Sequence, residues 1–205
     1  MKEAVVLIHG IWMTGLEMLP LQRRLRQEGL EAHIFHYHSL IWPPARNARL
    51  LNDYLRALDA DIVHLVAHSL GGLVLLHLFD RNPEQKPGRV LMLGSPLQGS
   101  HVARKLSRYF FTRPLIGRSI ERGLLGDAPR WKGQRKLIMI AGDRGFGVGS
   151  LVGGLPRPND GTVSLEETQS TAVNLHLRVP YSHFRMLVAR NVLDTIVACL
   201  RGEFD

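Results

Sequence analysis

The amino-acid sequence predicts an α/β fold, specifically a doubly wound, mainly parallel sheet of about six strands. Six short apolar runs alternate along the chain with segments of helical periodicity. The runs "AVVLI", "RVLML" and "KLIMI" are almost continuously apolar, which is typical of strands that helices cover on both faces. The strands are expected at residues 4–9, 32–37, 62–68, 89–94, 136–141 and 174–179.

Helices are expected in the segments between these strands. "LQRRLRQEG" and "PARNARLLNDYLRAL" carry many arginines, for which a solvated helix face is the simplest explanation. The last helix places Leu187, Val188, Val192, Ile196 and Leu200 along one face. The expected helices span residues 15–28, 45–58, 70–80, parts of 101–125, and 183–200.

A single domain spanning residues 1–205 is expected, because this length suits one core and no linker or repeat divides the chain. The opening "MKEAVVLIHG" lacks the cleavage pattern of a secretion signal. No apolar run reaches the roughly 18–20 residues of a membrane-spanning helix. The only cysteine, Cys199, has no partner for an internal disulfide. These features predict a cytoplasmic protein and leave its oligomeric state open.

The chain is basic, with 26 Lys and Arg residues against 18 Asp and Glu residues and a formal net charge of +8. Such a charge favours anionic partners, so contact with an anionic membrane surface is one expectation. Nucleic-acid binding would rest on charge alone and is not expected.

Ser69 lies where a predicted strand turns into a predicted helix, within "DIVHLVAHSLGGLVLLHLF". Its surroundings, Ala67-His68-Ser69-Leu70-Gly71, follow the pattern G-x-S-x-G of a nucleophile elbow, with alanine at the first position. The sharp turn is expected to bring the residues two before and two after the serine together, so both must be small. Ser69 is therefore the candidate nucleophile.

A serine that attacks an acyl carbon creates an oxyanion, which needs preorganised N–H donors. The backbone N–H of Leu70 is one candidate, because it begins a helix whose dipole favours negative charge. The N–H of Ile11 is the second, because "HGIW" follows the first strand and Gly10 permits an unusual backbone path. His9 is then a residue that shapes this loop.

The general base should be a histidine on a loop beyond another strand. His183 in "RVPYSHFRMLV" meets this condition, since it follows the last strand. His33, His36 and His38 resemble a metal cluster, yet no carboxylate or cysteine accompanies them at ligand spacing, so no metal site is expected.

A carboxylate should orient the base and lie between serine and histidine in chain order. Asp143 in "LIMIAGDRG" directly ends the fifth strand, and Asp160 in "RPNDGTVSLEE" lies in a later turn. Position alone leaves the two nearly even.

The ordered set "HGIW", "AHSLGG", "NDGTVS" and "YSH" resembles the α/β-hydrolase superfamily, and most closely the small bacterial lipases and related acyl-ester hydrolases. The likeness runs from His9 to His183. It implies that Asp160, in the Asn-Asp-Gly-x-Val segment, completes the triad and that Asp143 structures its own loop. Asp143 remains the alternative acid. It also implies the same oxyanion donors as the strand-end argument.

The sequence therefore predicts a serine hydrolase that cleaves carboxylic esters of lipid-like or other apolar acyl substrates through an acyl-enzyme, without cofactor or metal. An acyl thioesterase or a lysophospholipase would use the same residues. A non-catalytic, hydrolase-like binding protein would be expected to lack a triad member, and none is missing.

Two segments are candidates for shaping the substrate site. Residues 101–125 mix basic with aromatic and aliphatic side chains, which suits a lid, a membrane-contacting helix or a core-facing crossover helix. Residues 143–159 form a long stretch rich in Gly and Pro, as lids and binding loops do. The length leaves no room for a large cap domain, so an open cleft is expected.

Overall fold

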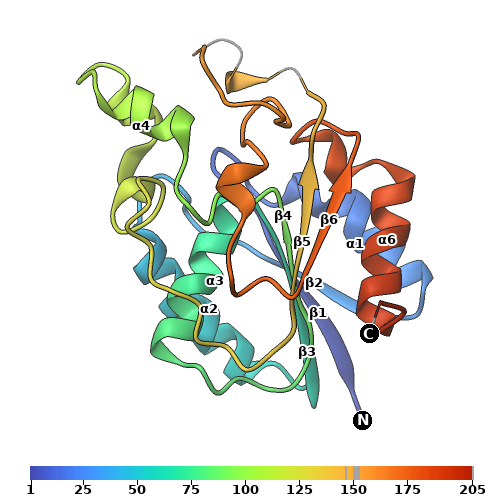
Figure 1. Cartoon of the computed structure of the whole chain (residues 1–205). Coiled ribbons are helices and arrows are strands. Elements are labelled where there is room, and N and C mark those ends of the chain that lie inside the picture. Colours follow the sequence, from blue (N-terminus) through green and yellow to red (C-terminus); the bar gives the residue numbers. More distant parts are fainter. Residues whose placement is uncertain (146, 150–152, 205) are drawn as a thin grey trace.

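A six-stranded sheet forms the centre of the structure, a computed structural model that describes residues 1–145, 147–149 and 153–204 (Figure 1). The strands are β1 (Glu3–Ile8), β2 (Glu31–Phe35), β3 (Ile62–His68), β4 (Val90–Leu93), β5 (Leu137–Gly142) and β6 (Leu175–Val179). They are all parallel, in the order β2-β1-β3-β4-β5-β6. This order results when the chain starts inside the sheet and winds outward first in one direction and then in the other. The predicted fold class is confirmed.

Helices cover both faces of this sheet, because alternate strand residues point to opposite sides. The α-helices are α1 (Leu19–Gln27), α2 (Pro44–Ala57), α3 (Leu70–Arg81), α4 (His101–Ser107) and α6 (Arg190–Arg201). Ala4, Val6 and Ile8 of β1 belong to the core that includes α2 and α3, whereas Val5 and Leu7 belong to the core that includes α1 and α6. Figure 1 shows these helix pairs on opposite sides of the sheet. Burial on both faces explains the continuous apolar runs of the sequence.

Two helices start later than their periodicity predicts. The helix expected from residue 15 begins as a short 3₁₀ turn, Leu16–Met18, and becomes α1 at Leu19. The last helix was expected from residue 183, but α6 begins at Arg190 because Ala189 has an extended backbone, with φ −69° and ψ 119°. Val188 consequently leaves the predicted apolar face and is 54% exposed. Within the described ranges, no helix combines the length and apolar character needed to cross a bilayer.

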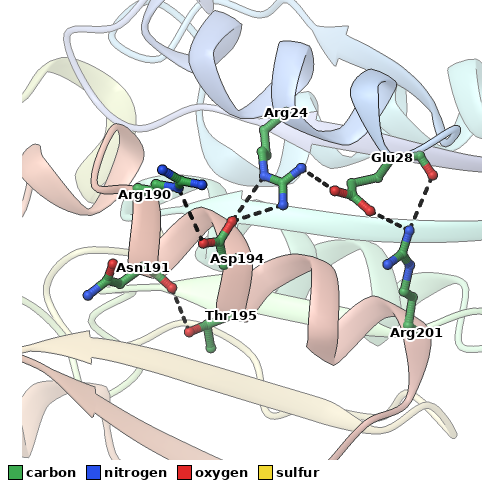
Figure 2. Close-up of polar contacts among 7 residues, drawn as sticks. All are labelled: Arg24, Glu28, Arg190, Asn191, Asp194, Thr195 and Arg201. Atoms are coloured by element: carbon green, nitrogen blue, oxygen red, sulfur yellow. Dashed lines mark hydrogen bonds and ion pairs between the residues drawn. The ribbon is translucent and has the colours of Figure 1, made fainter.

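Charged side chains join α1 to α6 at the surface (Figure 2). Arg24 of α1 donates from Nε to Asp194 Oδ1 of α6 at 3.0 Å, and it also binds Glu28 of the same turn. Arg201, in the last turn of α6, binds the carboxylate of the same Glu28. The hydrogen bond from Arg24 lowers the pKa of the Glu28 carboxyl below its usual value. Because these groups are exposed or only half-buried, water screens the ion pairs and each contributes little to the stability of the fold.

The carboxyl ends of the central strands meet at one edge of the sheet. The register pairs Ile8 with Ala67 and His68 with Leu93, so the loops that leave β1, β3 and β4 start side by side. Ser69, the first residue after β3, donates its backbone N–H to the carbonyl oxygen of Leu93 at 2.9 Å. The start of α3 is thereby fixed against the end of β4.

Candidate active site

Ser69 occupies a strained turn between β3 and α3. Its φ of 53° and ψ of −119° lie outside the regions that non-glycine residues prefer, and its side chain is nearly buried. The sequence argument expected Ala67 and Gly71 to approach each other. A Cβ at Gly71 would lie 2.6 Å from the carbonyl oxygen of Ile8, so the small residue also lets α3 pack against the end of β1.

The loop after β1 lies directly against this serine. A Cβ at Gly10 would be 3.1 Å from the Cβ of Ser69. The N–H of Gly10 points to the sulfur of Met13 at 3.2 Å, which holds the loop in place. Among the described residues, neither the N–H of Ile11 nor that of Leu70 has a hydrogen-bond acceptor. Two N–H groups near Ser69 thus remain available to an oxygen atom.

His9 supports the loop from inside. It is fully buried, its ring stacks on Tyr37 with centroids 4.2 Å apart, and its Nδ1–H donates to the carbonyl oxygen of Gly10 at 2.9 Å. The Tyr37 hydroxyl donates to the carbonyl oxygen of His9 at 2.7 Å. Burial lowers the pKa of His9 and keeps its imidazole neutral. Through these contacts, His9 holds the loop after β1 in its shape.

His183 and Asp160 form a buried pair at the same edge of the sheet. The Nδ1–H of His183 donates to Asp160 Oδ2 at 2.6 Å, and both side chains are nearly inaccessible to water. The other carboxylate oxygen, Oδ1, accepts the N–H groups of Thr162 at 2.9 Å and Val163 at 2.7 Å. The backbone N–H of His183 also donates to the carbonyl oxygen of Asp160 at 2.9 Å. With Nδ1 protonated, the Nε2 of a neutral His183 carries a free lone pair.

Asp143 lies at the end of β5 and has a different partner. Its carboxylate binds the guanidinium of Arg178 on β6. Its N–H donates to the carbonyl oxygen of Val179 at 3.0 Å, which ties it to the neighbouring strand. The structure therefore brings Asp160 to His183 and leaves Asp143 in an ion pair between two strands.

His68 and Gly94 are site residues to which the sequence argument gave no role. The Nε2–H of His68 donates to the carbonyl oxygen of His183 at 3.1 Å, and the two ring centroids are 4.5 Å apart. Burial, reinforced by the nearby His183, holds the pKa of His68 well below its usual value, so its ring stays neutral.

Gly94, directly after β4, has a φ of +55°. A Cβ at this position would lie 3.0 Å from Asp160 Oδ2 and 3.1 Å from the Cε1 of His183. The position of Gly94 at the carboxyl end of a central strand could have indicated that other side chains approach the backbone closely there.

The three histidines considered for a metal site have separate partners. His33 Nε2 lies 2.9 Å from a carboxylate oxygen of Glu31, and the Nδ1–H of His36 donates to the carbonyl oxygen of Thr14 at 2.8 Å. His38 meets the ring of Trp42 edge-on at 4.8 Å. In the part of the chain that the structure describes, no group of three or more metal-ligating side chains occurs.

Two hollows adjoin the candidate site. One, of about 570 Å³, lies beside the loop of Ile11 and is lined by apolar residues such as Trp12, Met13 and Trp42 and by polar ones such as His36 and His38. The other, of about 900 Å³, is lined by parts of the segment 143–159. Residues 146 and 150–152 of that proposed lid lie outside the described residues.

The comparisons with known proteins agree with this architecture. The sequence matches the alpha/beta hydrolase family over residues 5–198. The mature form of a lipase from Bacillus licheniformis superposes with a TM-score of 0.74 at 17% identity, covering 97% of this chain and 92% of that one. A metagenomic carboxyl esterase gives a TM-score of 0.72 at 13% identity, covering 99% of this chain and 76% of that one.

The carboxylesterase CesB from Bacillus subtilis gives a TM-score of 0.63 at 13% identity, covering 100% of this chain and 85% of that one. At these identities the structural likeness concerns the fold. No curated protein gives a significant sequence match. The family match spans nearly the whole chain, and the sheet order and helix layers agree with it. The chain belongs to the alpha/beta hydrolase family.

Proposed function

We propose that this protein is a serine hydrolase that cleaves carboxylic esters of lipid-like or other apolar acyl substrates. In this proposal Ser69 is the nucleophile, His183 the general base and Asp160 the residue that orients the base. The observation that carries the proposal is the buried hydrogen bond of 2.6 Å between His183 Nδ1 and Asp160 Oδ2, at the strand edge where Ser69 sits in a strained turn. A serine, a histidine and a buried carboxylate in this relation support nucleophilic acyl transfer.

The first half of the reaction forms an acyl-enzyme. Ser69 Oγ attacks the acyl carbon, and its proton passes to the Nε2 of His183. The resulting imidazolium is stabilised by Asp160, whose carboxylate is held by two further N–H groups. The oxyanion accepts hydrogen bonds from the N–H groups of Ile11 and Leu70. The bond to the leaving alcohol then breaks, and His183 returns the proton to its oxygen.

The second half releases the acid. A water molecule gives a proton to His183 Nε2 as its oxygen attacks the acyl carbon, and the bond to Ser69 Oγ breaks as that oxygen regains the proton. Each residue thus returns to its starting protonation state. Ester hydrolysis changes no oxidation state, so the reaction needs no oxidant or reductant.

Two observations favour ester substrates with an apolar acyl group. The lining of the hollow next to the loop of Ile11 includes the apolar side chains of Trp12, Met13, Ile41 and Trp42 beside polar ones such as His36 and His38, and the apolar part suits an acyl chain. The similar structures include proteins named as a lipase and as carboxyl esterases. Thioester and lysophospholipid substrates would use the same residues and differ in the groups that the hollows accept.

The test measures ester and thioester hydrolysis by the wild type and by Ser69→Ala. A series of p-nitrophenyl esters and acyl thioesters of increasing chain length identifies the preferred acyl group and bond. We expect Ser69→Ala to lose several orders of magnitude in turnover while its unfolding transition stays close to that of the wild type.

A fluorophosphonate probe should label the wild type and not Ser69→Ala, because it reacts with activated serines. Ser170→Ala, which changes a serine outside the proposed triad, serves as the matched control and should retain labelling. If the wild type neither labels nor hydrolyses any ester or thioester of the series, the protein is a hydrolase-like binding protein and the proposal fails.

A further inference from the structure

An exposed group of aromatic and aliphatic side chains follows α4. We call Tyr109, Phe110, Phe111 and Leu115 the aromatic tip; their exposed fractions are 58%, 88%, 66% and 52%. The rings of Tyr109 and Phe111 stack with centroids 5.6 Å apart, and Phe110 meets Phe111 edge-on at 5.7 Å. The three rings therefore contact one another at the surface, and all four exposed side chains contribute little to the core. Contiguous apolar surface of this kind indicates a binding surface.

The backbone around the tip is held in a defined shape. The Thr112 hydroxyl donates to the carbonyl oxygen of Leu106 at 2.5 Å, and the N–H of Arg113 donates to that of Tyr109 at 3.1 Å. Beyond the tip, Ile116 is buried and anchors the chain. Because hydrogen bonds and the buried Ile116 fix the segment at both ends, the exposure of its rings is part of the folded structure and does not require local unfolding.

The same segment carries positive charge without acidic residues. Residues 101–115 contain Arg104, Lys105, Arg108 and Arg113 and no Asp or Glu. Arg108 and Arg113, which flank the rings, are exposed and form no ion pair within the part of the chain described by the structure. The formal net charge of the whole chain, these residues included, is +8. The tip thus combines apolar rings with cations that face water.

The chemistry of the tip fits an anionic phospholipid surface. Aromatic rings partition into the interfacial region of a bilayer, and neighbouring Arg and Lys side chains bind its acidic head groups. A second copy of this chain on the same surface would place like charges together, which is unfavourable. A protein partner would need to supply a concave pocket for rings that project as far as Phe110. We propose that the aromatic tip docks the protein on anionic phospholipid membranes.

The tip is connected to the candidate active site. The indole N–H of Trp12, the residue after Ile11, donates to the carbonyl oxygen of Leu115 at 2.5 Å. Figure 1 shows α4 at the end of the molecule toward which the β5 and β6 arrows point, which is the end that carries the site. Docking would bring the proposed site to the membrane surface. The substrate class that follows is an ester of a membrane lipid or of an amphiphile dissolved in it, and this consequence rests on the proposed function.

The experiment measures sedimentation of the full-length protein with phosphatidylcholine vesicles, with and without phosphatidylglycerol. It uses the Ser69→Ala variant, so the binding result does not depend on hydrolysis or on products. We expect binding to vesicles that contain phosphatidylglycerol, little binding to phosphatidylcholine alone, and a decrease in binding as added salt screens the charges.

Two pairs of variants locate the binding surface. Phe110→Ser combined with Phe111→Ser should weaken partitioning at least roughly tenfold, since it removes two rings from the interface. Phe204→Ser, which alters an exposed ring in the segment after α6, should have no such effect, and Figure 1 shows α6 on the opposite side of the molecule from α4. Arg108→Gln combined with Arg113→Gln should abolish the preference for phosphatidylglycerol. Arg49→Gln combined with Arg56→Gln, an equal charge change on exposed positions of α2, should reduce binding far less.

Several outcomes would overturn the proposal. They are the absence of binding to phosphatidylglycerol vesicles, equal binding to both vesicle types, and unchanged binding after the two Phe substitutions. Loss of self-association in the Phe110 and Phe111 variant, without vesicle binding by the parent, would assign the tip to a second copy instead. Failure of the proposed hydrolase function appears separately, as absent hydrolysis of water-soluble esters by the wild type in lipid-free buffer.

Discussion

Asp160 and Asp143 end in different surroundings although both follow β5 in the sequence. Asp160 accepts hydrogen bonds from His183, Thr162 and Val163, whereas Asp143 pairs with Arg178. The carboxylate of Asp160 is buried and fully used, so its charge acts on His183 with little screening by water. The difference makes the two aspartates a natural pair for mutation.

Asp160→Asn should reduce turnover by about three to four orders of magnitude with one p-nitrophenyl ester. A neutral amide at this position favours the wrong tautomer of His183 and does not stabilise its cation. Asp143→Asn is the matched control and should cost much less, because it removes an ion pair between β5 and β6 outside the proposed triad. Equal losses in the two variants, with unchanged unfolding transitions, would contradict the proposed role of Asp160.

The sequence could predict Ser69 more securely than its acid. The residues that shape the turn around Ser69 are its immediate neighbours, so the local pattern reports the local geometry. The approach of Asp160 to His183 depends on how the loops after β5 and β6 fold over the sheet edge, and chain position left Asp143 equally placed. A resemblance to known hydrolases favoured Asp160, and the hydrogen bond to His183 now supports that choice. His68 and Gly94 were missed because their contacts are with Asp160 and His183, which lie in loops far along the chain.

At the scale of elements, the start of α3 is a tightly packed contact of the fold. A Cβ at Gly71 would lie 2.6 Å from the carbonyl oxygen of Ile8, which is backbone of β1. A Cβ at Gly72 would lie 2.2 Å from the Oγ of Ser95, which is a side chain. The first obstacle cannot move without shifting a strand, while the second disappears if the side chain is removed.

Gly71→Ala and Gly72→Ala should both lower the free energy of unfolding, by about 1–3 kcal/mol for overpacking, partly offset by the better helix propensity of alanine. Adding Ser95→Gly should recover much of the loss in Gly72→Ala. The Ser95 hydroxyl has no hydrogen-bond partner within the described residues, so its removal breaks no hydrogen bond. The same addition should not rescue Gly71→Ala. Urea unfolding of the four variants measures this, and rescue of both glycine variants would contradict the packing argument.

The central strands β1, β3, β4 and β5 could be predicted well because burial on both faces requires a continuous apolar run in the sequence. The starts of α1 and α6 could not be predicted, because the apolar periodicity continues through short turns that precede them. The short turns Arg185–Leu187 and Leu16–Met18 keep an apolar pattern although neither belongs to an α-helix. The segment 101–125 mixed core and surface positions, and the structure divides it into α4, the aromatic tip and two 3₁₀ turns, Arg113–Leu115 and Gly117–Ile120.

At the scale of the whole molecule, the accessibility of the Cys199 thiol depends on whether α6 stays packed against the sheet. Cys199 lies on α6, is fully buried, and belongs to the core that joins α1 and α6 to the sheet. Burial raises the pKa of its thiol to about 11. An unfolded cysteine titrates near pH 8.5, so the folded and unfolded states bind protons differently above that pH.

The sign of this linkage predicts a loss of stability in alkali. Because the folded-state pKa is raised, the stabilisation is fully present below about pH 8.5 and disappears as the pH rises toward that of the folded thiol. Each unit of difference corresponds to about 1.4 kcal/mol of unfolding free energy. Cys199→Ala removes the titrating group and leaves a small packing defect that does not depend on pH. The advantage of the wild type over Cys199→Ala should therefore shrink steadily between about pH 8 and pH 11.

Urea unfolding of both proteins across this pH range measures that difference directly. Other alkaline groups are common to the two chains and cancel, including Tyr37, whose phenol pKa burial also raises. A thiol reagent provides an independent readout, since it should modify Cys199 only when the α6 face opens, with a rate that rises through the unfolding transition. A constant stability difference from pH 8 to pH 11, together with rapid labelling of the native protein, would mean that α6 leaves Cys199 open to solvent.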